Sequence, residues 1–182
     1  MELRTKRRLQ LVFIFLLFAA PLLIAVVLHI ENWRPGHTRN IGRLVEPPQD
    51  VGSVELILRD GSPLAWKDPA RSWTLLAFSG PDCAEHCRAK LDQLRRARIT
   101  LNQNSDRLRI VYLGVDLQPA VWQTLQPLIP SADPSHRFSA LHPVQADTIT
   151  AALVDPNGFL MLQYDSDFDA NGLRKDLARM IR

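Results

Sequence analysis

Two cysteines, Cys83 and Cys87, are the only thiols in the 182-residue chain, and three residues separate them. On a helix this spacing is about one turn, so both sulfur atoms lie on one face and the Cα atoms lie roughly 6 Å apart. Such a pair could form a reversible disulfide, or its thiolates could hold a soft ion such as Cu(I). Two plainer alternatives remain open: a static structural disulfide, and unreactive thiols that face the core.

The neighbouring sequence places this pair between a buried strand and a helix. Residues 73–78 form a nearly continuous apolar run, which is typical of a central strand covered on both faces. A segment of turn residues follows, and a helix is expected from residue 82 or 83 to Leu101. The unpaired N–H groups and the positive end of that helix would stabilise a thiolate, so we expect a lowered pKa for Cys83 in particular.

Three histidines are candidates for a further metal ligand beside the thiols. His86 lies between the two cysteines, but it is expected to point about 100° away from the second cysteine around the helix. His136 and His142 lie in an irregular segment before the last hairpin, which could fold back over the end of the sheet. For each, an exposed or capping role is the commoner outcome. Asp82 and Glu85 are expected to be charges at the helix start that raise the thiol pKa, rather than acid–base catalysts.

The order of the predicted elements indicates an α/β, thioredoxin-like fold over residues 54–182. Apolar runs bounded by turn residues predict strands at 54–58, 73–78, 108–115, 149–154 and 159–164. Besides the helix at the cysteines, helices are expected from Pro119 to about Gln126 and at the C-terminus, and residues 127–143 are expected to be irregular. A strand, a helix and a parallel strand, closed by a hairpin and a helix, predict a central sheet covered on both faces.

An N-terminal membrane anchor is predicted before this domain. Residues 11–28 contain no charged side chain, and the apolar segment extends over residues 9–30, which is enough to cross a bilayer as a helix. Residues 1–8 form a basic flank that should stay in the cytoplasm and place the C-terminal domain outside. A cleaved signal peptide is the alternative, but no small-residue cleavage site follows Leu28. Residues 31–53 contain several prolines and glycines and are expected to be a tether.

Charge and motif content exclude several classes of function. The net charge is +3, but residues 44–182 carry 15 basic and 17 acidic residues, so the basic excess belongs to the anchor and its flanks. A nucleic-acid-binding domain would carry that excess in its folded part, so no nucleic-acid partner is expected. The sequence has no glycine-rich phosphate-binding loop and no ordered Ser-His-Asp set, which argues against kinase, hydrolase and nucleotide chemistry.

Residues 54–182 resemble the SCO/SenC family, the membrane-anchored thioredoxin-fold copper proteins of cytochrome c oxidase assembly. The segments that carry the resemblance are Phe78-Ser79-x-x-x-Cys83-x-x-x-Cys87 and Leu153-x-Asp155-Pro156-x-Gly158. The resemblance implies that the two cysteines bind copper and that the partner is the copper-bearing subunit II of cytochrome c oxidase. It also implies a single-pass protein of the bacterial cytoplasmic (inner) membrane, with its domain on the outer, periplasmic side.

The resemblance is incomplete around the metal site. The family has a proline after the second cysteine, where this chain has Arg88, and a distal histidine shortly before the hairpin strand. Counting back from Pro156 places the position of that histidine near Asp147, and residues 144–156 contain no histidine. The two cysteines are therefore carried over from the family, and the histidine ligand is not.

Three functions follow as hypotheses. The first is an assembly factor for cytochrome c oxidase that handles Cu(I), reduces thiols, or does both through Cys83 and Cys87. The second is an enzyme, a membrane-tethered thiol–disulfide oxidoreductase in which Cys83 attacks and Cys87 resolves. The three-residue spacer, and the lack of a proline just before the hairpin strand, argue against a general exchanger of the thioredoxin type. The third is a non-catalytic interaction module whose disulfide only holds the helix start.

Overall fold

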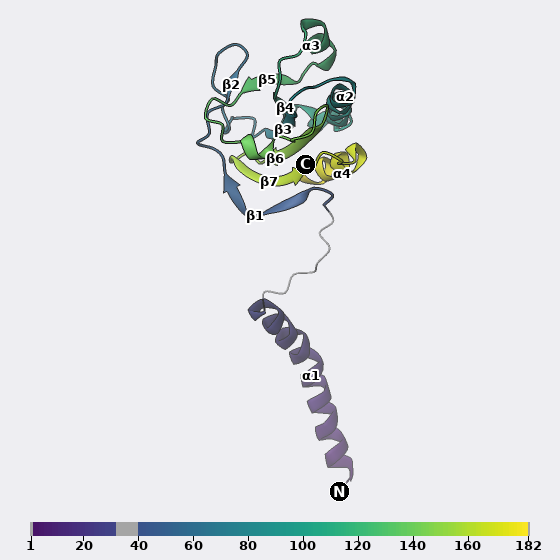
Figure 1. Cartoon of the computed structure of the whole chain (residues 1–182). Coiled ribbons are helices and arrows are strands. Elements are labelled where there is room, and N and C mark those ends of the chain that lie inside the picture. The colour runs from purple at the N-terminus through teal and green to yellow at the C-terminus, as the bar shows by residue number, and fades with distance from the viewer. Residues whose placement is uncertain (1, 32–39, 182) are drawn as a thin grey trace. The chain divides into compact units, whose positions relative to one another are not determined.

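A computed structural model describes residues 2–31 and 40–181, which belong to two separate compact units. The first unit contains the helix α1 (Glu2–Ile30), drawn in purple in Figure 1. Its segment Lys6–Leu28 is long and apolar enough to cross a membrane, by length and composition. The predicted anchor, residues 9–30, lies within this helix, and its large apolar side chains are exposed, as a lipid-facing helix requires. The part of the predicted tether at residues 32–39 lies outside the described residues.

The second unit is built on a seven-stranded mixed sheet with the order β1-β7-β6-β3-β4-β5-β2 (Figure 1). The strands are β1 (Arg43–Asp50), β2 (Ile57–Leu58), β3 (Trp73–Ser79), β4 (Leu108–Leu113), β5 (Ile129–Ala132), β6 (Ile149–Val154) and β7 (Phe159–Tyr164). At the centre, β3 pairs in parallel with β4 and antiparallel with β6. The hairpin of β6 and β7 has the predicted bounds, and β3 has the predicted start and ends one residue later.

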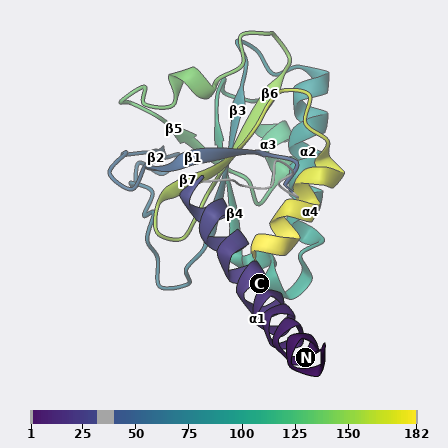
Figure 2. The same cartoon turned by 90° about the horizontal axis from the view of Figure 1, so that it is seen from below.

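Helices cover one face of the sheet and loops cover the other. The helices of this unit are α2 (Glu85–Ile99), α3 (Pro119–Leu125) and α4 (Ala170–Met180), with short 3-10 helices η1 (Asn102–Arg107) and η2 (Ser139–Leu141). Helix α2 lies beside α4 on the same face (Figure 2). In β3, Leu75 and Ala77 pack with the helices, whereas Leu76 and Phe78 pack with loop residues that include Trp66. The apolar run of this strand is therefore continuous because successive side chains enter two different cores.

The tether prediction was wrong over its C-terminal half, because residues 43–50 form the strand β1 and the folded unit begins at Asn40. This strand pairs antiparallel with β7 at the edge of the sheet, and most of its residues are exposed. Few of its side chains enter the core, so the sequence shows no apolar period there. Pro47 and Pro48 are accommodated because an edge strand does not need every N–H group for pairing.

Other segments also differ from the prediction. The strand expected at residues 54–58 is reduced to the two residues of β2, although Leu56 is fully buried. Most of the apolar residues of this segment pack into the core on the face of the sheet that loops cover, and only the last two of the five residues pair as a strand. Residues 127–143, expected to be irregular, contain β5 and η2, and β5 extends the sheet in parallel with β4. Helix α2 is also shorter at both ends than the predicted helix.

A buried carboxylate fastens the start of the folded unit to its last helix. Asp176 of α4 is fully buried, and its Oδ2 accepts hydrogen bonds from the N–H groups of Ile41 at 2.8 Å and Gly42 at 3.0 Å. The hydroxyl of Tyr164 donates to the same oxygen at 3.3 Å, and Arg179 lies 3.6 Å from the other oxygen. Burial, together with the negative charge of Asp176, raises the pKa of Tyr164. Residues 41–42 are therefore an integral part of the domain.

Candidate functional site

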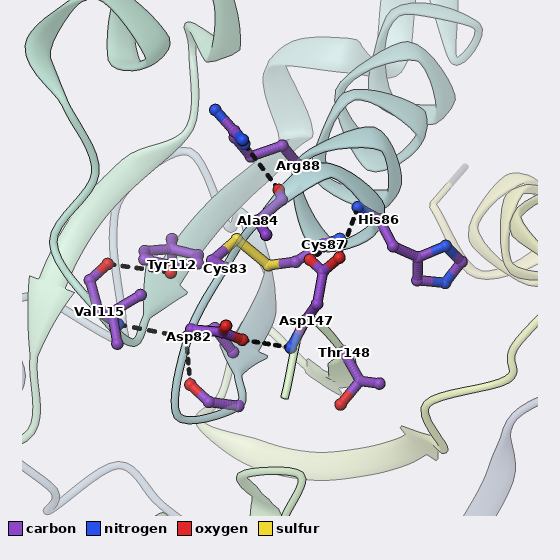
Figure 3. Close-up of a disulfide and its surroundings, with 12 residues drawn as sticks. Asp82, Cys83, Ala84, His86, Cys87, Arg88, Tyr112, Val115, Asp147 and Thr148 are labelled. Carbon is purple, nitrogen blue, oxygen red and sulfur yellow. Dashed lines mark hydrogen bonds between the residues drawn. A yellow bond between two sulfur atoms is a disulfide. The ribbon is translucent and has the colours of Figure 1, made fainter. Parts of the chain in front are cut away.

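Cys83 and Cys87 form a disulfide between the end of β3 and the first turn of α2 (Figure 3). Their Cα atoms lie 5.0 Å apart, within the range that a disulfide requires, so the sulfur atoms converge as the spacing predicts. Cys87 is completely buried in the core beneath the helices, whereas Cys83 is only partly buried. Cys83 is therefore the more accessible of the two cysteines to a reactant from solvent.

The loop before the cysteines is held against the segment that precedes β6. The N–H group of Gly80 donates to the carbonyl oxygen of Thr148 at 3.0 Å. A Cβ atom on Gly80 would overlap the carbonyl oxygen of Gln145, so this close approach requires glycine. On the other side, the hydroxyl of Ser79 accepts a hydrogen bond from the N–H group of Val115 at 3.2 Å. These contacts fix the direction in which the chain leaves β3 and enters the cysteine segment.

Asp147, from the segment before β6, caps the helix that carries the cysteines. Its carboxylate accepts hydrogen bonds from the backbone N–H groups of His86 at 3.0 Å and Cys87 at 2.8 Å (Figure 3). Its own N–H group donates to the carboxylate of Asp82. The N-cap residue of α2, Ala84, has no side chain that could do this. Hydrogen bonds to the carboxylate, chiefly from the Cys87 N–H group, lower the pKa of Asp147 below its ordinary value.

This cap corrects one expectation from the sequence, that free N–H groups at the helix start would stabilise a thiolate. Two of these groups are instead occupied by a carboxylate, so the N–H groups of His86 and Cys87 are not available to a sulfur atom. Sequence reasoning missed this role because Asp147 is 60 residues from Cys87, and no local pattern connects them. One signal was present: Asp147 lies where the SCO/SenC resemblance places its distal histidine.

The structure brings none of the three candidate histidines to the sulfur atoms. The imidazole of His86 is exposed and points away from the disulfide (Figure 3). The Nδ1–H group of His142 donates to the carbonyl oxygen of Ser79 at 2.9 Å, and its ring packs edge-on against Phe78 at 5.2 Å. His136 is exposed and lines, with His142, a separate surface cavity of about 400 Å³. The ligand predictions for these histidines are therefore not supported by their placement.

The residues around the cysteines do not fit the copper site that the resemblance implies. Among residues 2–31 and 40–181, no group of three or more histidine, cysteine or acidic side chains could hold a metal ion. Asp147 lies near the position that the resemblance assigns to the third ligand, the distal histidine. Its carboxylate already accepts hydrogen bonds from two backbone N–H groups. Carboxylate oxygen is also a hard ligand, whereas Cu(I) prefers thiolate, thioether or imidazole.

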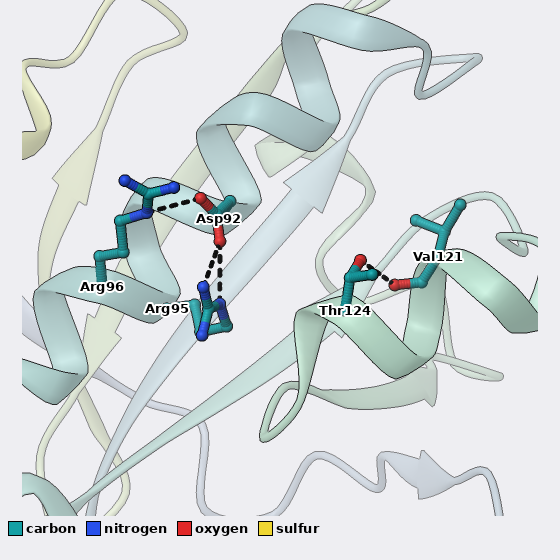
Figure 4. A network of polar contacts seen from close by, with 5 residues as sticks. All are labelled: Asp92, Arg95, Arg96, Val121 and Thr124. Atoms are coloured by element: carbon teal, nitrogen blue, oxygen red, sulfur yellow. Dashed lines mark hydrogen bonds and ion pairs between the residues drawn. The ribbon is translucent and has the colours of Figure 1, made fainter.

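Several charged side chains of α2 are bonded within the helix or to its N-cap residue. Asp92 bonds both Arg95, with an ion-pair distance of 2.7 Å, and Arg96, also at 2.7 Å (Figure 4). Arg88, which stands where the SCO/SenC family has proline, donates from Nε to the carbonyl oxygen of Ala84 at 2.6 Å. Glu85 lies in the first turn of α2, as predicted for a charge at the helix start.

Reducing the disulfide is expected to lower the free energy of unfolding by about 2 kcal/mol without unfolding the domain, because the loop that it closes is very short. Urea unfolding of the oxidised and reduced protein, followed by tryptophan fluorescence, would measure this difference. Reduced protein that loses its circular dichroism without urea would contradict the prediction. Such a result would favour the third hypothesis, in which the disulfide is structural.

Comparison with known proteins identifies the domain. Residues 73–182 match the family model described as "Transmembrane-like, thioredoxin-like, C-terminal domain". No curated protein matches the sequence significantly. The apo Sco1 protein from Thermus thermophilus has a solved structure that is 19% identical, with a TM-score of 0.58, covering 81% of this chain and 99% of its own.

Two further solved structures with a similar fold are a SCO1/SenC family protein and a putative protein disulfide isomerase. A SCO1/SenC family lipoprotein from Bacillus anthracis is 14% identical with a TM-score of 0.53, covering 76% of this chain and 99% of its own. A putative protein disulfide isomerase from Bacteroides thetaiotaomicron is 14% identical with a TM-score of 0.54, covering 78% of this chain and 94% of its own. At these identities the likeness shows the fold alone, and the predicted thioredoxin-like fold is confirmed.

Proposed function

The chain belongs to the family of transmembrane-like, thioredoxin-like C-terminal domains, and we propose that it is a membrane-anchored thiol–disulfide redox protein. One observation carries this proposal: a partly exposed Cys83 is joined to a fully buried Cys87 at the start of α2. An exchange reaction needs one accessible sulfur atom to meet the client and one protected sulfur atom to release it. A disulfide that served only as a structural link would not need this difference in exposure.

In the reducing direction, Cys83 in the reduced pair loses its proton and attacks a disulfide of the client. One client sulfur leaves as a thiolate, and a mixed disulfide forms between the client and Cys83. The thiolate of Cys87 then attacks the sulfur of Cys83, releases the second client thiolate and closes the disulfide seen in the structure. The client gains two electrons, and a dithiol donor must return two electrons to the cysteine pair before the next cycle.

We further propose that the client is a subunit of cytochrome c oxidase, most simply its copper-bearing subunit II, whose cysteines would be kept reduced. The SCO/SenC resemblance of the cysteine segment and of the turn before β7 supports this client. The basic flank before the apolar helix supports a bacterial cytoplasmic membrane location with the domain on the periplasmic side. An oxidising compartment outside that membrane is also where disulfide chemistry takes place.

Equilibration with glutathione tests the redox function. The full chain in detergent is incubated with buffers of different thiol-to-disulfide ratio, and free thiols are then labelled with a maleimide that retards migration in a gel. We expect one transition in which both cysteines change state together, and no transition in a variant with Cys83→Ser and Cys87→Ser. A disulfide that does not exchange over hours would overturn the proposal.

A titration with Cu(I) against a competing chelator distinguishes redox chemistry from copper carriage. In this alternative the ion would be cargo, held by the two thiolates alone. Stoichiometric binding by the reduced protein, lost in the double serine variant, would favour copper carriage. Because the third-ligand position holds the hydrogen-bonded carboxylate of Asp147, we expect the chelator to retain the ion.

A further inference from the structure

A negative charge lies where a thiolate would find its best hydrogen-bond donors. The first N–H groups of a helix have no partner within the helix, and in proteins with reactive cysteines such donors lower the pKa of a nearby thiol. In this chain the two oxygen atoms of Asp147 accept separately from the N–H groups of His86 and Cys87. The carboxylate points toward the helix start that carries the disulfide (Figure 3).

The other charged groups around the helix start reinforce this arrangement. Asp82 binds the N–H group of Asp147 and adds a second carboxylate close to the cysteine segment. Glu85 adds a third in the first turn of α2. The two basic side chains nearby are directed elsewhere, since His86 points away from the disulfide and Arg88 binds a carbonyl oxygen of its own helix (Figure 3). The local charge therefore opposes a thiolate on the pair.

We infer that Asp147 is a positioning residue that makes the reduced cysteine pair a stronger electron donor, an inference that rests on the proposed redox function. Because its carboxylate occupies the helix donors, a thiolate at Cys83 receives less stabilisation. A reduced pair that is less stable relative to the disulfide gives up its electrons more readily. The same side chain joins the segment before β6 to the helix start, so it holds the site together while it sets the redox balance.

The backbone at Asp147 makes a clean test possible. Its φ of 52° lies in the left-handed region, which asparagine tolerates well and glycine tolerates best. Asp147→Asn removes the charge and keeps an oxygen that can accept one of the two hydrogen bonds. Asp147→Gly removes both the charge and the cap without straining the backbone. The two variants thus separate the effect of charge from the effect of the hydrogen bonds.

The test measures the glutathione equilibrium of the full chain in detergent and the rate of thiol alkylation against pH. For Asp147→Asn we expect the equilibrium constant to shift about tenfold toward the reduced pair, equivalent to about 30 mV. The pH at which alkylation reaches half its maximal rate should fall by about one pH unit. Asp147→Gly should shift both quantities in the same direction and at least as far.

Glu85→Gln is the matched control, because it removes the same charge from the first turn of α2 at a residue whose side chain does not cap the helix. We expect it to shift the equilibrium less than half as far, on a logarithmic scale. An unchanged or opposite shift in both Asp147 variants would overturn the inference, as would an equal shift in the control. If the wild-type pair does not exchange with glutathione at all, the proposed function fails, and the inference fails with it.

Discussion

Cys87→Ser is expected to accumulate a mixed disulfide between Cys83 and an oxidised client, whereas Cys83→Ser should accumulate none. The reason is the difference in burial: Cys83 is partly exposed, and Cys87 is fully buried beneath the helices. Without the resolving thiol of Cys87, the chain cannot release the client as a dithiol, and the mixed disulfide can decay only by reversal of the first step. Incubation of each reduced variant with a peptide that contains an internal disulfide, taken from the client proposed above, followed by non-reducing electrophoresis and mass spectrometry, measures the adduct.

Both single variants should lose exchange activity, to the background of the double serine variant, so the adduct and not the activity discriminates between them. Wild-type protein should release the peptide as a dithiol and show no lasting adduct. Equal adducts from the two single variants would contradict the assignment of Cys83 as the attacking residue. An adduct only in Cys83→Ser would reverse the roles of the two cysteines.

Asp176→Ala is expected to destabilise the domain by about 3 kcal/mol, because it leaves buried groups without their acceptor. The N–H groups of Ile41 and Gly42 and the hydroxyl of Tyr164 all point at one oxygen atom of this fully buried carboxylate. Loss of the carboxylate should also release the start of β1 from α4. Urea unfolding measures the change in free energy, and hydrogen exchange at residues 41–42 reports the local release.

Two control variants separate this effect from a general effect of charge. Asp92→Ala removes a carboxylate from ion pairs that are partly exposed, so we expect a loss of less than about 1 kcal/mol. Asp176→Asn keeps an acceptor oxygen, so its loss of unfolding free energy should lie between those of Asp176→Ala and Asp92→Ala. If Asp176→Ala costs no more than Asp92→Ala, the start of the domain is not held by this carboxylate.

Local patterns in the sequence were sufficient for the elements that form the core. The continuous apolar run of β3 and the turn between β6 and β7 led to the correct strands, because each pattern follows directly from burial or from turn geometry. The two edge strands, β1 and β2, and the short strand β5 beside β2 were not predictable in this way. β1 has exposed side chains and two prolines, and β2 and β5 have two and four residues, so little of their sequence is shaped by the core.

The sequence by itself determined that two cysteines one turn apart would meet at the junction of a strand and a helix, since strand burial and helix geometry are local properties. Only the tertiary structure decided which sulfur is buried, where Asp147 lies, and that the candidate histidines are directed elsewhere. These outcomes depend on contacts between segments about 60 residues apart. Such contacts arise from the packing of the whole chain, and no periodicity or spacing within one segment records them.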